Sequence, residues 1–349
     1  MGRIPVSVSA WCRCLIVFVL LMSGMVESAM SQGEAPQEQD QPGMPFNWPT
    51  KTLGGRQFWT DVVHISGWRI QRHAVTGHHR LIDSENVRQG WGTLPQCQKR
   101  LSKILDQGAV PPNSEKVVIV LHGLMRSSNS MEPISRYIRE NSDYQTINME
   151  YASSRSDVAS HARDLAFLID HLGKDVKQIS FVAHSMGNIV VRHYLKDLNG
   201  SGTQADPRFH RMVMMGPPNQ GSQMARFLKN NLLFKSLAGV PGIELGEQWE
   251  DLAPRLATPH FEFGIIAGAQ TESQKLNNFL LNGPDDFTVS LEETRLVGAR
   301  DWLVRPLLHT TMMKNEIALE STVRFLKSGY FLSAAEANPI LPSSPETER

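Results

Sequence analysis

Residues 178–191, QISFVAHSMGNIVV, constrain the fold more than any other segment of the chain. An apolar run leads to Ser185, which has Ala183 two residues before it and Gly187 two residues after it, and an apolar helical pattern follows. Small residues at these two positions permit a sharp turn between a strand and a helix, which leaves the serine hydroxyl exposed above a sheet. A buried strand followed by a helix with an N-cap serine would give a similar short pattern. Other segments must therefore distinguish the two interpretations.

A second strand with a characteristic loop precedes this segment. Residues 116–121, KVVIVL, form the β-branched run typical of a strand buried on both faces of a parallel sheet. His122 and Gly123 follow, and then an apolar helical pattern. A strand, a His-Gly loop and a helix form the unit in which α/β-hydrolases place one oxyanion-hole amide. We therefore predict that the amides of Leu124 and Met186 form the oxyanion hole, although a simple strand-ending turn would also explain the His-Gly dipeptide.

The order of elements also selects a candidate base. Four histidines follow Ser185, namely His193, His210, His260 and His309. His193 lies about two turns into the helix that starts at the serine, so the helix rise carries it away from the hydroxyl. His210 and His260 stand at the entry of predicted strands, whereas sites in open α/β sheets form at the carboxyl ends. His309 follows an apolar strand-like run and precedes a helix, so we predict that it is the base.

The acid of such a site is expected to follow the next strand, at residues 261–268. A polar loop after this strand leads to Asp286, our preferred acid, with Asp285 as a close alternative and Asp301 as a third candidate. A carboxylate is needed there because it holds the imidazole in the right tautomer and stabilises the imidazolium that forms during attack. The resulting order of serine, acid and histidine is the one expected on this fold.

Four segments together resemble the lipase-type serine esterases of the α/β-hydrolase superfamily, a group that includes bacterial triacylglycerol lipases and GPI-inositol-deacylase-like esterases. They are AHSMG at 183–187, MGPPNQGS at 215–222, DFTVSLEETRL at 286–296 and LHTTMM at 308–313. The resemblance covers about residues 115–330. It implies that Asp286 is the acid, because the acid of the family stands just before a Val-Ser strand. This family usually carries glycine after the acid, whereas this chain has Phe287.

Strands and helices alternate through the rest of this region, with a strand predicted at 144–149 and an amphipathic helix at 157–172. The predicted fold is an α/β-hydrolase, a doubly wound, mostly parallel sheet with a helical cap insertion. That insertion could pack on the core or form a lid that offers an apolar face to an acyl chain. The predicted organisation is a signal peptide (1–31), a disordered linker (32–50), an N-terminal hairpin and helix packed on the core (51–114), a catalytic domain (115–332) with its cap at about 222–259, and a disordered tail (333–349).

The first residues have the features of an export signal. Arg3 and Arg13 precede the apolar run 14–22, which is too short to span a membrane comfortably, and small residues at 29–31 suit signal-peptidase cleavage. We therefore predict a periplasmic or secreted protein, with an uncleaved N-terminal membrane anchor as the alternative. Cleavage would leave Cys97 as the single cysteine, so the mature chain would have no internal disulfide.

Charge and metal-ligand spacing exclude some classes of partner. The chain has 35 Lys and Arg residues against 35 Asp and Glu residues and no basic stripe, so a nucleic acid is not an expected partner. His73, His78 and His79 have no cysteine or carboxylate at ligand spacing, which favours a structural or surface role over a metal site.

The predicted function is that of an exported serine hydrolase that cleaves carboxylic esters through Ser185, His309 and Asp286 and an acyl-enzyme intermediate. No metal or organic cofactor is required for this chemistry. The expected partner is an ester or lipid substrate, with transient contact to a membrane or lipid interface through the cap and no obligate protein partner. An acyltransferase of the same fold shares these residues, and a non-catalytic hydrolase-fold binding protein is the alternative from another class.

Overall fold

The structure is a computed structural model that describes residues 50–52, 56–108, 110–200, 206–269 and 283–342. These residues belong to one unit, Phe46–Arg349. The predicted signal peptide, nearly all of the predicted linker and the last seven residues of the predicted tail lie outside the described residues, so export of the protein stays a prediction. Among the described residues, no helix has the length and apolar character needed to cross a membrane.

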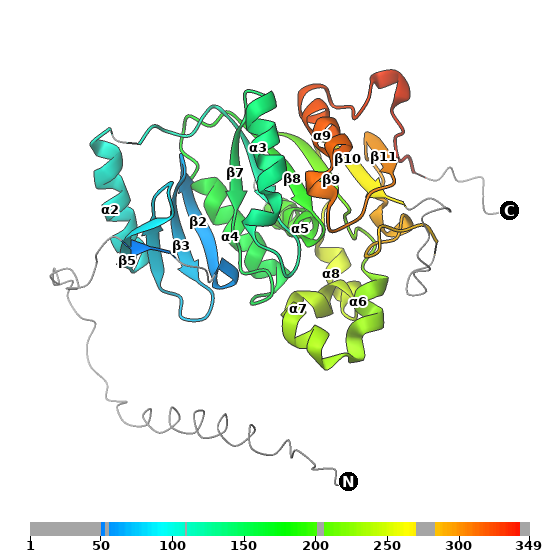
Figure 1. Ribbon diagram of the computed structural model, residues 1–349, viewed down its shortest axis with the longest axis horizontal. Helices are drawn as coiled ribbons and strands as arrows, with labels where there is room; N and C mark the ends of the chain where they lie inside the picture. Colours follow the sequence, from blue (N-terminus) through cyan, green and yellow to red (C-terminus); the bar gives the residue numbers. More distant parts are fainter. Residues whose placement is uncertain (1–49, 53–55, 109, 201–205, 270–282, 343–349) are drawn as a thin grey trace, which may run out of the picture. The chain divides into compact units, whose positions relative to one another are not determined.

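Six strands form a parallel sheet whose residues are mostly buried, because helices cover both faces. The spatial order is β11-β10-β9-β8-β6-β7, and every neighbouring pair runs parallel (Figure 1). This confirms the predicted α/β-hydrolase type of sheet. The strands are β6 (Lys116–Leu121), β7 (Gln145–Met149), β8 (Gln178–His184), β9 (Phe209–Met215), β10 (Glu262–Gly268) and β11 (Asp301–Arg305).

The two faces of the sheet bury separate apolar clusters, because successive side chains of a strand point to opposite faces. Ile119 of β6 belongs to the cluster with helices α4 and α5, and Val120 belongs to the cluster with helices α3 and α9. The chain is therefore doubly wound, with two helices on each face (Figure 1). These helices are α3 (Glu132–Asn141), α4 (Val158–Asp170), α5 (Met186–Gly200) and α9 (Glu316–Ser328).

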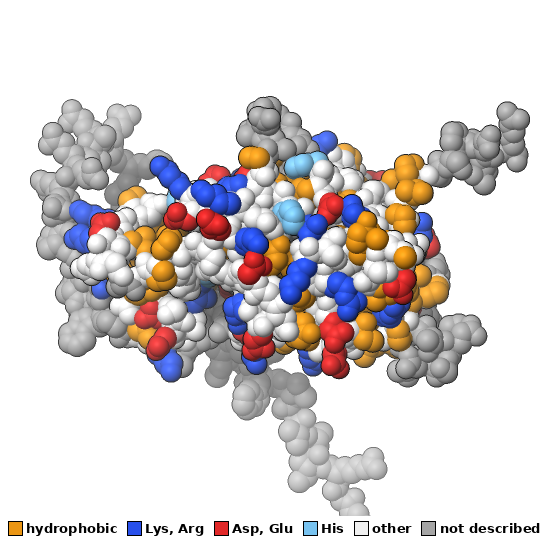
Figure 2. Space-filling model, turned by 90° about the horizontal axis from the view of Figure 1, so that it is seen from above, with side chains coloured by type: hydrophobic (Ala, Val, Ile, Leu, Met, Phe, Trp, Pro, Cys, Tyr) orange, Lys and Arg blue, Asp and Glu red, His pale blue; other side chains and the backbone are white. Residues whose placement is uncertain are grey.

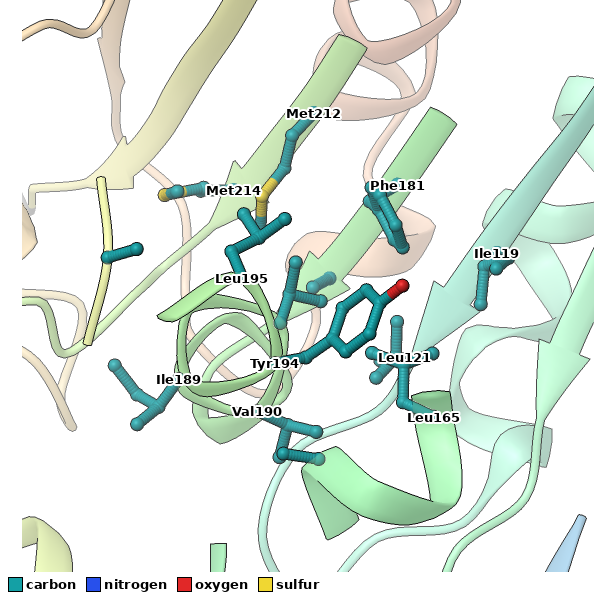
Figure 3. Packing of buried hydrophobic residues seen from close by; sticks show 14 of the residues in the cluster. Ile119, Leu121, Leu165, Phe181, Ile189, Val190, Tyr194, Leu195, Met212 and Met214 are labelled. Atoms are coloured by element: carbon teal, nitrogen blue, oxygen red, sulfur yellow. The ribbon is translucent and has the colours of Figure 1, made fainter. Parts of the chain in front are cut away.

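Helix α5 is fixed against the sheet by its buried face. Figure 3 shows Val190 and Tyr194 of this helix packed among Leu121, Leu165 and Phe181, which come from β6, α4 and β8. All five side chains are buried. Burial of each such side chain contributes about 1.5–3 kcal/mol. The N-terminal end of α5, which directly follows Ser185, therefore has a fixed position at the edge of the sheet.

The N-terminal region forms a second sheet that is antiparallel and has the order β1-β5-β4-β3-β2. The sequence predicted a hairpin here, which is the pair β2–β3, but three further strands were missed. Glycine and charged residues interrupt the alternation of apolar and polar residues in Val87–Gly92. The elements are β1 (Thr50–Lys51), η1 (Arg56–Phe58), β2 (Trp59–Ile65), β3 (Trp68–His73), β4 (His79–Ile82), β5 (Val87–Gly92) and α2 (Leu94–Asp106), which buries Cys97 and Leu101 against the sheet.

Two histidines of the N-terminal region take part in an aromatic cluster on this sheet. The rings of His73 and His78 stack with their centroids 5.2 Å apart, and both rings contact the Trp59 ring edge-on, at 4.8 and 5.1 Å. The Arg80 guanidinium lies 3.9 Å from the centroid of the same tryptophan. Elsewhere on the surface, Figure 2 shows Lys and Arg side chains interspersed with Asp and Glu over the face that it presents.

The segment between β9 and β10 forms short helices, as the sequence predicted. Its two ends are tied to α5 by the buried Arg192, whose guanidinium donates to Asn219 Oδ1 at 3.0 Å and to the Ala257 carbonyl at 3.0 Å. Glu244 also accepts a hydrogen bond of 2.9 Å from the Val158 amide at the start of α4. The segment, which we call the cap, contains α6 (Gln223–Phe227), η3 (Leu228–Asn230), α7 (Leu232–Leu245), α8 (Trp249–Leu252) and η4 (Ala253–Arg255), grouped together in Figure 1.

The C-terminal segment corrects one prediction. Residues 333–342 were expected to be a disordered tail, but they pack along β11. Ile340 is buried and its amide and carbonyl bond to Ala299 and Gly298 at 3.0 and 2.9 Å, while the Trp302 amide donates to the Asn338 carbonyl at 2.9 Å. Prolines and polar residues obscured this packing, because one apolar anchor does not produce a periodic pattern.

Two buried histidines predict acid sensitivity of the fold. Burial lowers the pKa of His64 and of His161 from 6.5 to about 3. Between these values the unfolded chain binds more protons than the folded chain, so stability is full above pH 6.5 and falls as the pH drops toward 3. From pH 7 to pH 5 each histidine should cost about 2 kcal/mol of unfolding free energy. Asp164, whose pKa burial raises to about 6, offsets part of this loss because it takes up a proton in the folded state.

Urea unfolding at pH 7 and at pH 5 measures this effect. A His161→Leu variant should lose about 2 kcal/mol less than the unaltered chain between the two pH values. An equal loss in both proteins would contradict the assignment of His161 as a neutral, buried side chain.

Candidate active site

Ser185 occupies a strained turn between β8 and α5. Its φ angle is 53°, in the left-handed region that non-glycine residues rarely adopt and that costs about 1–3 kcal/mol. A Cβ atom at Gly187 would lie 2.8 Å from the His122 carbonyl oxygen and 3.0 Å from the Leu121 side chain, so only glycine allows α5 to start this close to β6. Ala183, the other small residue of the motif, is fully buried.

The loop after β6 lies beside this serine because β6 and β8 are neighbours and Leu121 pairs with Ala183. A Cβ atom at Gly123 would lie 3.0 Å from the Ser185 Cβ. The Arg126 amide donates to the Gly123 carbonyl at 3.3 Å and closes a turn in which Met125 has a φ of 56°. This turn brings the Leu124 amide, and the start of α5 brings the Met186 amide, to the same edge of the sheet. Within the described part of the chain, neither amide donates to a protein acceptor.

The structure brings His309 and Asp286 into direct contact. The His309 Nδ1 atom lies 2.7 Å from Asp286 Oδ2, and the His309 amide donates to the Asp286 carbonyl at 3.0 Å. The other carboxylate oxygen, Oδ1, accepts from the amides of Thr288 and Val289 at 3.0 and 2.8 Å. Asp286 is fully buried. These bonds fix the carboxylate and, through it, the imidazole.

The two alternative acids have other partners. Asp285 Oδ1 accepts from the Phe287 amide at 2.7 Å, a bond within its own turn. Asp301 opens β11 and accepts from the amides of Phe331 and Asn338 at 2.8 and 3.0 Å. It therefore lies at the opposite end of the sheet from the loop that carries His309, and it anchors the C-terminal segment.

Phe287 has a backbone conformation that favours glycine. Its φ angle is 75°, a conformation that glycine adopts without a steric penalty. The backbone of Phe287 is therefore strained in the turn after Asp286. The Val-Ser strand that the resemblance implied is limited to an isolated bridge between Asp285 and Ser290.

The segment after β9 contacts both Ser185 and this pair. Its amide donates to the Met215 carbonyl at 2.9 Å, and the next residue, Gly216, has a φ of 53°. A Cβ atom at Gly216 would lie 2.9 Å from His309 Nδ1 and 3.2 Å from Asp286 Oδ2. Among the described residues, no hydrogen bond joins the Ser185 hydroxyl to His309. In ligand-free enzymes this bond is often long and shortens when substrate binds.

His184 was missed as a contributor to the site. Its Nε2 atom lies 3.0 Å from the His309 carbonyl oxygen, and the two rings are 4.5 Å apart. Burial lowers the pKa of His184 well below its usual value, so the ring is neutral and Nε2 carries the proton that it donates. In the sequence, the position of His184 directly before Ser185 could have indicated this contribution.

The other histidines considered as the base have other surroundings. His193 bonds to Asp197 at 3.1 Å and His210 to Gln178 at 2.9 Å, while His260 lies between the η4 turn and β10.

Part of the chain is similar to a known protein family. Residues 111–216, which contain the loop after β6 and the serine turn, match the family described as "Putative serine esterase (DUF676)". The chain is similar to serine esterases. This confirms the predicted resemblance and supports ester hydrolysis by a serine hydrolase.

Solved structures with a related fold include a lipase, a phospholipase and a carboxyl esterase. They are the mature lipase BlEst2 of Bacillus licheniformis (TM-score 0.45, 18% identity, 62% of this chain and 94% of that chain), phospholipase PlaB of Legionella pneumophila (0.41, 19%, 52% and 45%) and the metagenomic carboxyl esterase MGS0156 (0.44, 17%, 58% and 68%). No curated protein matches the chain in sequence.

Proposed function

We propose that this serine-esterase-like chain hydrolyses carboxylic esters through Ser185, His309 and Asp286. The observation that carries the proposal is the 2.7 Å contact between His309 Nδ1 and Asp286 Oδ2, at the edge of the sheet where the strained Ser185 turn lies. Only a histidine held in this tautomer presents a free Nε2 atom that can accept the serine proton.

In the proposed reaction, the Ser185 oxygen attacks the ester carbonyl carbon while its proton passes to His309 Nε2. Asp286 stabilises the imidazolium that results. The amides of Leu124 and Met186 donate to the oxyanion of the tetrahedral intermediate. The alcohol then leaves with the proton from His309, and an acyl-serine remains. Water attacks this acyl-serine by the same route and releases the acid.

Exposed apolar side chains next to the site, and one on the cap, favour an ester with an acyl chain. Met125, in the turn beside the serine, and Leu308, the residue before the base, are each 41% exposed. Phe227 on the cap is 60% exposed. Apolar surface of this kind would contact the acyl chain of a substrate or a lipid interface. We therefore include transient contact with a lipid interface in the proposal.

A fluorophosphonate probe and a chain-length series of nitrophenyl esters test the proposal. The folded chain should form one covalent adduct on the peptide that contains Ser185, and heat-unfolded chain should form none. Hydrolysis should increase from acetate to longer esters if the apolar side chains bind the acyl group. A folded chain without adduct formation would instead favour a non-catalytic binding protein, and acyl transfer to an added alcohol in preference to water would favour an acyltransferase.

A further inference from the structure

The loop 122–128, which carries the proposed oxyanion amide of Leu124, is held by the two residues after β7. At one end, the Ser128 hydroxyl donates to Glu150 Oε2 at 2.7 Å, and the Ser128 amide lies 3.3 Å from the same oxygen. At the other end, the Tyr151 hydroxyl donates to the His122 carbonyl. The loop is therefore clamped on both sides of the turn that presents Leu124.

Glu150 also contacts the first residue of the loop. Its second oxygen, Oε1, lies 3.4 Å from His122 Nε2, and His122 Nδ1 lies 2.9 Å from the Gly123 carbonyl oxygen. The Tyr151 amide donates to His122 Nε2 at 3.4 Å, so the ring carries its proton on Nδ1, which donates to that carbonyl. Glu150 thus holds the far end of the loop through Oε2, while Oε1 lies beside the ring at the near end and forms no hydrogen bond to a described residue. Glu150 is 1% exposed, so water does not compete for these contacts.

The N-terminal sheet fixes Glu150 in turn. Asp61 of β2 accepts from the Glu150 amide through Oδ2 at 2.8 Å, and the Asp61 amide donates to the Glu150 carbonyl at 2.8 Å. The other oxygen of Asp61 accepts from the Gln71 amide group at 2.7 Å. Asp61 is fully buried, and desolvation raises its pKa, so burial of two neighbouring carboxylates carries an energetic cost. Neutral side chains could pack in this place at lower cost.

We propose that Glu150 is a positioning residue that aims the Leu124 amide at the oxyanion, and that Asp61 of the N-terminal sheet holds Glu150 in place. The inference rests on the proposed function. Glu150 itself touches no reacting atom. Its effect belongs to the tetrahedral state, because a displaced amide weakens a bond to the oxyanion and leaves binding of the planar ester unchanged.

Glu150→Ala should therefore lower kcat about 10²-fold and change KM less than about twofold, since loss of one oxyanion donor costs about 10²–10³ in kcat. Affinity for a trifluoromethyl ketone, which forms a tetrahedral adduct on the serine, should fall by the same factor as kcat/KM. Glu150→Gln keeps an acceptor for Ser128 and should recover a large part of the loss. Ser128→Ala removes the shorter bond and should lower kcat about tenfold.

Asp301→Asn is a matched control, because Asp301 is a buried carboxylate like Glu150. It accepts hydrogen bonds from two backbone amides at the far end of the sheet. It should lower Tm and leave kcat unchanged. If Glu150→Ala does not fold, Glu150→Gln and Ser128→Ala carry the test. Variants that lose Tm but keep kcat and ketone affinity would overturn the inference, while the unaltered chain still hydrolysed esters. An unaltered chain without esterase activity would overturn the proposed function, and this inference with it.

Discussion

Ser185→Ala should lower kcat/KM for nitrophenyl esters by about four to six orders of magnitude, because the nucleophile and its base act as a unit and removing either one removes most of the catalysis. The loss should appear in kcat. Stopped assays with long incubation times, compared with the rate in buffer, can measure a residual activity of this size. The same variant should fail to react with the fluorophosphonate probe.

Stability separates this loss from unfolding. Alanine has the same steric difficulty as serine at a φ of 53°, so Ser185→Ala should leave Tm nearly unchanged. Ser185→Gly should be equally inactive but should raise Tm, because glycine adopts this conformation without strain. A Ser185→Ala protein with substantial esterase activity would contradict the proposed role of the residue.

Asp286→Asn should lower kcat about 10⁴-fold, whereas Asp285→Asn should change it less than about threefold. An amide in place of the Asp286 carboxylate favours the wrong tautomer of His309, which then presents a protonated Nε2 to the serine. Asp285 bonds to the amide of Phe287 within its own turn, and an asparagine there still offers an oxygen to that amide. Steady-state kinetics of the two variants, which differ by one position in the chain, make the comparison.

A larger loss of kcat in Asp285→Asn than in Asp286→Asn would assign the acid to Asp285. Equal small losses would exclude both carboxylates as partners of His309. Circular dichroism and Tm should be recorded for both variants, since Asp286 also accepts two backbone amides and its substitution should lower Tm.

The sequence was most informative where local pattern and local structure agree. The run 116–121 predicted β6 with its bounds, because a β-branched segment buried on both faces has few other stable arrangements. The residues around Ser185 predicted a strained turn, and the φ angle of 53° agrees with this. His309 could be selected by elimination and order, whereas order alone left Asp285 and Asp286 open as the acid and the resemblance favoured Asp286. The structure places His309 Nδ1 2.7 Å from Asp286 Oδ2. The Asp286→Asn and Asp285→Asn variants test whether the two residues act together in catalysis.

Contacts between distant segments could not be predicted in this way. Asp61 and Glu150 are 89 residues apart, and neither belongs to a periodic pattern that points to the other. The contact of His184 with the His309 carbonyl spans 125 residues. Such polar contacts depend on how the two sheets pack, which hydrophobic periodicity does not specify. The packing of Ile340 was missed for a related reason, since a lone apolar residue among prolines gives no repeat.

The packing of residues 338–340 along β11 covers part of the outer edge of the parallel sheet. β11 is the last strand of the parallel sheet, and an uncovered outer strand is a template on which another chain can add a strand. Here the Trp302 amide and the backbone of Ala299 are already occupied by the chain's own end. A polypeptide cut after Leu332 would keep all the proposed catalytic residues but would expose the edge of β11. We expect such a polypeptide to be less soluble while its catalytic residues stay in place.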